Sequence, residues 1–121
     1  MKGISFWFFF SGVVYVTLGM AWGIEMGMRH DFQMAPAHAH LNLVGWVTMA
    51  LFGVFYHLVP NAAESGLAKL HFAVATLGVW LLVPGIAMTL KSGAEGMAIA
   101  GALVTLASML IFLLTVVRSR A

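Results

Sequence analysis

Residues 37–59, AHAHLNLVGWVTMALFGVFYHLV, decide the fold of this chain. The stretch contains no Asp, Glu, Lys or Arg, and its length is close to the roughly 20 residues that a helix needs to cross a bilayer. It lacks the alternation of apolar and polar side chains that is typical of a barrel strand. Because backbone polar groups in hydrocarbon must find partners within their own segment, the stretch predicts a transmembrane helix.

Three other segments, 4–24, 70–90 and 97–117, are also apolar. The chain of 121 residues is 62% hydrophobic and 8% charged, with a mean hydropathy of +0.99, which is far too apolar for a soluble domain of this size. We therefore expect an all-α integral membrane protein whose partner is the lipid bilayer. Residues 1–121 should form one domain with four transmembrane helices, at 4–24, 37–59, 70–90 and 97–117.

The basic residues predict the orientation in the membrane. Those on one side of the expected helices are Lys2, Lys69, Arg118 and Arg120, and those on the other side are Arg29 and Lys91. The side that is richer in basic residues is expected to be cytoplasmic. We therefore expect a multi-pass protein of a bacterial-type inner (cytoplasmic) membrane with both termini in the cytoplasm. The net charge of +2 reflects these flanking residues and does not suggest a nucleic-acid partner.

His38 and His40 need a partner, because an unsatisfied imidazole in hydrocarbon is costly. Residues two apart on a helix are separated by about 200°, so these two side chains should point to nearly opposite faces. Such a pair is poorly placed to chelate one metal ion, and each histidine should serve a different neighbour. The chain has no cysteine, which excludes thiolate ligation from this chain alone.

His57 and His71 are expected near the cytoplasmic surface. His57 lies roughly 25 Å along the helix axis from His40 and cannot share a small site with it. His71 opens the third expected helix on the same side, so the two could meet. We favour the simpler interpretation that each lies at the membrane interface with water or backbone partners.

Glycines four residues apart, at Gly19, Gly23 and Gly27, allow another helix to approach closely. We favour packing within the chain over self-association as the reason for this spacing. In the third expected helix, Pro84 and Gly85 predict a kink or a loosened turn.

The string from His38 to Val47, followed in register by Phe52, Gly53 and Pro60, resembles one helix of a known family. It is similar to the tenth helix of the catalytic subunit (subunit I) of haem-copper oxidases and nitric oxide reductases, and closest to the branch that uses only b-type haems. The resemblance implies that His38 would ligate the high-spin haem and His40 the low-spin haem.

The family resemblance also implies an assembly. The catalytic subunit of that family has twelve transmembrane helices in three arcs of four, so a four-helix chain corresponds to one arc. Three copies would then rebuild the ring as a homotrimer with closed symmetry. His40 of one protomer could face an imidazole of the next and hold haem b between them.

Other parts of the family pattern are missing. The chain has no His-His pair for copper, and Glu25, Glu64 and Glu95 fall at or beyond the expected helix ends instead of forming a cluster for non-haem iron. We therefore do not expect a complete oxidase in this chain alone.

The favoured function is a small membrane haem b protein for electron transfer or diatomic gas binding, with an unknown redox partner. Trp46 would line the haem pocket and Arg29 would pair with the haem propionates. In the alternative, His38 and His40 bind copper or zinc together with His30 and Met34, because imidazole and thioether groups suit these metals. A third possibility is a structural or assembly protein without a cofactor.

Overall fold

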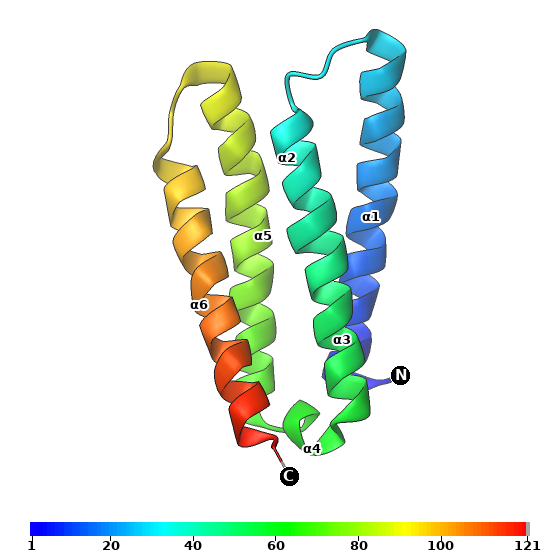
Figure 1. The fold of residues 1–121 in the computed structure, drawn as a ribbon, viewed down its shortest axis with the longest axis vertical. Coiled ribbons are helices and arrows are strands. Elements are labelled where there is room, and N and C mark those ends of the chain that lie inside the picture. The colour runs from blue at the N-terminus through cyan, green and yellow to red at the C-terminus, as the bar shows by residue number, and fades with distance from the viewer. Residues whose placement is uncertain (121) are drawn as a thin grey trace.

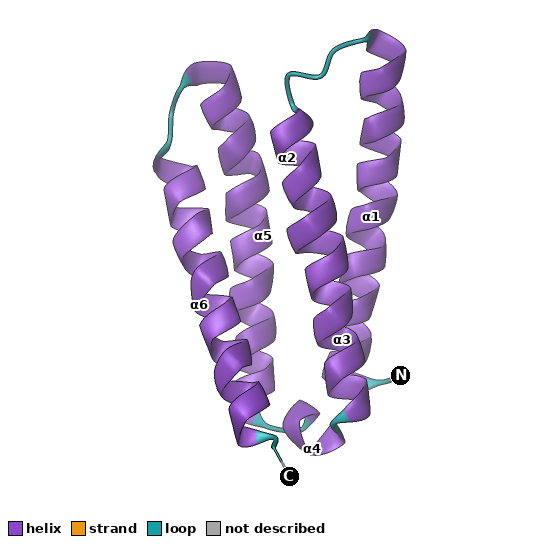
Figure 2. Cartoon of the chain, in the orientation of Figure 1, coloured by secondary structure: helices purple, strands orange, loops and turns teal. Residues whose placement is uncertain are grey.

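The computed structural model describes residues 1–120, which are almost entirely helical (Figures 1 and 2). Four spans are long and apolar enough to cross a membrane, as predicted. The second span, Ala35–Leu58, is continuous but changes its helix type twice. The elements are α1 (Gly3–Arg29), α2 (Ala35–His40), η1 (Leu41–Thr48), α3 (Met49–Leu58), α4 (Pro60–Ala63), α5 (Gly66–Ser92) and α6 (Gly96–Arg118).

Two of the helices extend well beyond the predicted ends. The expected first helix stops at residue 24, but α1 continues to Arg29 and ends where His30 takes a left-handed conformation with φ of 51°. The expected third helix starts at residue 70, but α5 starts at Gly66 because the Ser65 hydroxyl accepts a hydrogen bond from the Ala68 N–H. The predicted ends are based on hydropathy, which indicates the extent of the lipid-embedded segment, whereas the observed helix ends are set by capping residues.

The second span contains a π-helix, which the sequence analysis did not predict. In η1 the backbone is wound more widely than in an α-helix, and the Thr48 hydroxyl donates to the Leu43 carbonyl, five residues earlier, at 2.8 Å. The regular α-helix expected here is wrong for this segment. Because a π-turn takes in more residues than an α-turn, η1 changes which side chains the rest of the span presents to its neighbours.

Close helix contacts depend on glycines. A Cβ at Gly53 would lie 2.8 Å from the backbone N of Phe9, so α3 and α1 are nearly in backbone contact. Gly19 and Gly23 face the side chains of the second span, whereas a Cβ at Gly27 would have no neighbouring atom within 4 Å. Packing within the chain is thus confirmed for two of the three spaced glycines.

The α5–α6 pair is held in the same way, at Gly85 and Gly101. A Cβ at Gly85 would lie 2.5 Å from the Ala98 backbone N, and one at Gly101 would collide with the backbone of Leu82. Pro84 does not interrupt α5, which runs as one helix from Gly66 to Ser92 (Figure 1).

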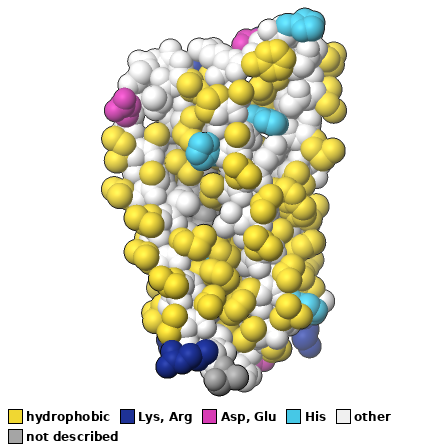
Figure 3. All heavy atoms as spheres, viewed as in Figure 1, with side chains coloured by type: hydrophobic (Ala, Val, Ile, Leu, Met, Phe, Trp, Pro, Cys, Tyr) yellow, Lys and Arg dark blue, Asp and Glu magenta, His cyan; other side chains and the backbone are white. Residues whose placement is uncertain are grey.

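Hydrophobic side chains cover most of the visible surface, and charged side chains lie at its two ends (Figure 3). Both termini lie at the lower end of the molecule in Figure 1, where α1 begins and α6 ends. An apolar belt with charged ends is the surface that a bilayer requires.

Candidate functional site

His38 lies in the interface between α2 and α1. Its Nε2 is 2.9 Å from the Gly19 carbonyl oxygen, so Nε2–H donates a hydrogen bond to that oxygen. The ring also meets Trp22 edge-on, at a centroid distance of 5.9 Å. A nitrogen that carries a proton has no lone pair for a metal. In this arrangement the Nε2 atom of His38 therefore stabilises helix packing and is not poised as a ligand.

His40 is arranged differently. Its Nδ1 lies 2.8 Å from the Pro36 carbonyl oxygen, one helical turn earlier, and Nδ1–H donates to it. The proton on Nδ1 leaves the Nε2 lone pair available. Histidines that bind metals commonly donate their other ring N–H to a backbone carbonyl in this way, which fixes the tautomer and the ring orientation. The ring is half-buried.

The two histidines therefore serve different sides of the second span, as their spacing predicts. Both lie in α2, which is regular α-helix, so the separation of about 200° applies to them. His38 faces α1, and the Nε2 atom of His40 has no hydrogen-bond partner among residues 1–120. Histidine side chains are visible in the upper half of the face shown in Figure 3.

Trp46 lies in η1 and packs on α1. Its ring meets Phe9 at a centroid distance of 6.1 Å, and its backbone oxygen and ring lie against Gly12. Trp46 is therefore on the same side of the span as His38. The structure does not place it beside His40, where the predicted haem pocket would need it.

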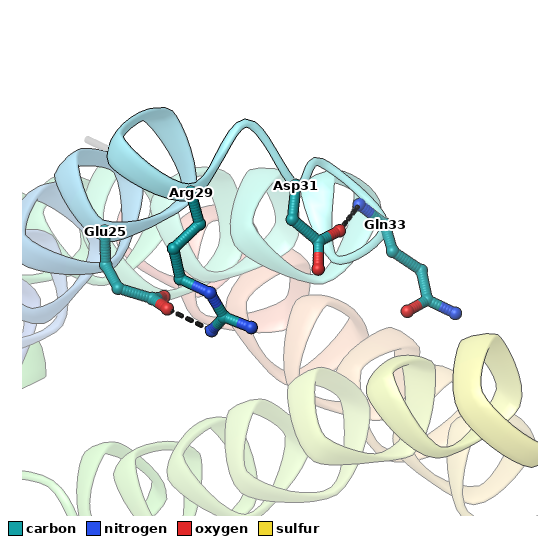
Figure 4. A network of polar contacts seen from close by, with 4 residues as sticks. All are labelled: Glu25, Arg29, Asp31 and Gln33. Atoms are coloured by element: carbon teal, nitrogen blue, oxygen red, sulfur yellow. Dashed lines mark hydrogen bonds and ion pairs between the residues drawn. The ribbon is translucent and has the colours of Figure 1, made fainter.

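Arg29 forms an ion pair with Glu25, one turn earlier on α1 (Figure 4). Both side chains are exposed, so the pair contributes little to stability. In the following loop, Asp31 accepts a hydrogen bond from the Gln33 N–H at 3.1 Å, and the Gln33 amide donates to the Leu90 carbonyl at 3.1 Å. The weak pair leaves Arg29 able to exchange Glu25 for another anion.

The predicted metal set is not gathered within one chain. His30 is exposed at the end of α1, and Met34 is half-buried just before α2. Across residues 1–120, no group of three or more His, Cys, Asp or Glu side chains is close enough to hold a metal ion. In the described residues, His38 and His40 therefore do not belong to a ready-made group of such side chains.

His71 is fully buried, which the sequence analysis did not foresee. Its Nδ1 lies 2.8 Å from the Tyr56 hydroxyl, and its Nε2 is buried without a hydrogen-bond partner. The rings of Phe8, Phe52 and Phe112 surround it at centroid distances of 4.9, 4.4 and 5.5 Å. Every membrane span contributes a ring to this aromatic cluster.

The interfacial position expected for His71 is therefore wrong, while His57 is exposed as expected. His71 lies more than one turn inside α5, which starts at Gly66, and it is buried because the rings of Phe8, Phe52 and Phe112 pack around it. His71 also meets Tyr56 instead of His57. The helix-capping signal at Ser65 could have revealed this position.

Removing one partner of the Tyr56–His71 hydrogen bond should cost more than removing both. Tyr56→Phe leaves Nδ1 of His71 without a partner and is expected to lower the unfolding free energy by about 1–3 kcal/mol, whereas the double variant with His71→Phe should recover much of that loss. Thermal unfolding in detergent, followed by circular dichroism, measures the difference. His57→Phe, at an exposed position, is the control. A double variant that loses the sum of the two single losses would contradict this account.

Comparison with known proteins finds one relationship. The chain is 35% identical over 62 residues to the Cbb3-type cytochrome c oxidase subunit CcoN1 of Stutzerimonas stutzeri, and the match covers 46% of this chain and 13% of that relative. No family model matches the chain, and no solved structure matches it. The relative belongs to the haem-copper oxidases, so a distant relationship of this chain to that family is supported.

Proposed function

We propose that this chain is a small haem b protein of the membrane, for electron transfer or diatomic gas binding, and that His40 would hold the haem iron. The observation that carries the proposal is the hydrogen bond from Nδ1 of His40 to the Pro36 carbonyl, which leaves Nε2 as a fixed donor of electrons to a metal. A half-buried imidazole on an apolar span fits haem iron, which proteins commonly hold through histidine. The distant oxidase relationship supports the same choice of cofactor.

The residues around His40 have separate tasks in this proposal. The Pro36 carbonyl holds the imidazole in the required tautomer, and the exposed Arg29 can exchange Glu25 for a propionate. The apolar surface of the spans excludes water. Haem b, when bound, supplies one-electron chemistry or a site for a diatomic gas.

We further propose a homotrimer with both termini in the cytoplasm of a bacterial-type cell. Two imidazole ligands favour electron transfer, but His38 and His40 of one chain cannot both hold the same haem, because they face opposite sides of the helix and Nε2 of His38 is bonded to Gly19. A second imidazole must therefore come from another copy. A single ligand per haem would instead leave an open coordination position, which favours gas binding.

The test is to express the protein with adequate haem and purify it in detergent. We expect a Soret absorption band, haem b in the pyridine haemochrome assay, and a native mass of three chains with haem. Stoichiometric copper or zinc without a Soret band would contradict the haem proposal. A monomer that retains all its haem would contradict a site shared between protomers.

A further inference from the structure

A cavity of about 370 Å³ opens at the end of the molecule that carries both termini. It lies between the start of α5 and the last turn of α6, and we call it the terminal cavity. Its polar lining consists of Asn61, Ser65, Thr115, Arg118, Ser119 and Arg120. This cavity is remote from His40, and the proposed function does not use it.

Two arginines give the terminal cavity a positive charge. In the described part of the chain, no carboxylate side chain lines the cavity, and the ion pair of Arg29 with Glu25 lies at the opposite end of the molecule. Arg120 donates one hydrogen bond to the Val117 carbonyl, at 3.4 Å. Each guanidinium has five N–H donors, so both arginines retain donors for an anion.

The hydroxyl groups of the cavity already donate their protons to the backbone. The Ser65 hydroxyl donates to the Ala62 carbonyl at 2.7 Å, the Thr115 hydroxyl to the Ile111 carbonyl at 2.9 Å, and the Ser119 hydroxyl to the Thr115 carbonyl at 2.7 Å. Recognition of a ligand therefore depends on the charged donors of the arginines. Such donors select a ligand that is anionic and rich in acceptor oxygens.

The start of α5 adds to the attraction for an anion. α5 is 27 residues long, and its first N–H groups, near Ser65 and Leu67, lie at the positive end of the helix dipole. The arginines also lie at the negative end of α6, so an alternative role for them is to offset that dipole alone. If the arginines bind an anion, the cavity holds a ligand; if they only offset the dipole of α6, it does not.

The position of the terminal cavity indicates the kind of anion. The second span ends at Leu58 and α6 ends at Arg118, so the cavity lies at the level of the bilayer surface. Val59 and Leu67 give it an apolar side. Basic pockets between transmembrane helices at this depth suit the headgroups of acidic lipids. We propose that the terminal cavity binds a phosphate group, supplied by the headgroup of an acidic phospholipid.

The test uses the full chain, delipidated in detergent and analysed by native mass spectrometry. Phosphatidylglycerol is titrated against phosphatidylcholine with the same acyl chains, and inorganic phosphate forms a separate arm. We expect phosphatidylglycerol to bind about tenfold more tightly than phosphatidylcholine, and the Arg118→Gln/Arg120→Gln variant to lose that preference, because charge-assisted hydrogen bonds carry it.

Lys2→Gln/Lys69→Gln is the matched control, because neither lysine lines the cavity. It also removes two positive charges from the same end and should keep the preference for phosphatidylglycerol. Equal losses in both variants would overturn the proposal by showing that only overall charge matters. Tighter binding of inorganic phosphate than of phosphatidylglycerol would overturn the assignment to a lipid. Circular dichroism melts of both variants confirm that they are folded.

Discussion

Replacement of His40 with alanine is expected to abolish the Soret band of the purified protein. The variant loses a nitrogen that the structure leaves available and oriented, because Nδ1 of His40 is committed to the Pro36 carbonyl and Nε2 is not. His38 cannot substitute for it, since it lies on the opposite face of α2 with its Nε2 bonded to Gly19. The spectrum is recorded at matched protein concentration, with haem supplied equally during expression.

Two controls separate ligand loss from misfolding. His57→Ala alters an exposed histidine roughly 25 Å along the axis from His40 and should retain the full band. His40→Gly should regain part of the band when free imidazole is added, because the small ligand can occupy the vacated space. If His38→Ala removes the band and His40→Ala does not, our assignment of the ligand is wrong.

The second large effect is expected in the contact between α5 and α6. Gly101→Ala places a methyl group against the backbone of Leu81 and Leu82, which cannot rotate away as a side chain could. The helices must separate, and we expect the free energy of unfolding to fall by about 1–3 kcal/mol. Small residues at such crossings are what allows membrane helices to pack, since lipid supplies little hydrophobic driving force between them.

Gly96→Ala is the matched control for this loss, because it lies in the same helix and a Cβ there would have no neighbour within 4 Å. The two variants are compared by unfolding in mixed detergent micelles at increasing SDS. Gly101→Ala should unfold at a clearly lower SDS fraction than the wild type, and Gly96→Ala should not. Equal midpoints for the two alanine variants would show that the close crossing is not needed for stability.

The sequence could predict those features that depend on lipid and on helix period. Apolar length alone located the four spans, and the 3.6-residue period placed His38 and His40 on opposite sides. Gly19 and Gly23 could be recognised as packing positions because glycines four residues apart lie on one face of a helix.

Other features depend on contacts that hydropathy does not encode. The π-helix of Leu41–Thr48 cannot be read from hydropathy, because no residue in it marks the change of helix type. The burial of His71 depends on where α5 begins and on Phe112, which lies far along the chain. The different hydrogen bonds of the two histidines depend on Gly19 and on the local turn at Pro36, so their different roles could be seen only in three dimensions.

The aromatic cluster around His71 has a consequence for how the protein matures in the membrane. Its rings come from all four spans: Phe8, Phe52 with Tyr56, His71 and Phe112. During synthesis, the imidazole of the third span enters the bilayer before Phe112 exists to cover it. Until α6 inserts, the cluster lacks the ring of Phe112, and arrival of α6 closes it over the imidazole. Full enclosure of His71 therefore waits for α6, which favours molecules with all four spans inserted over partly inserted ones.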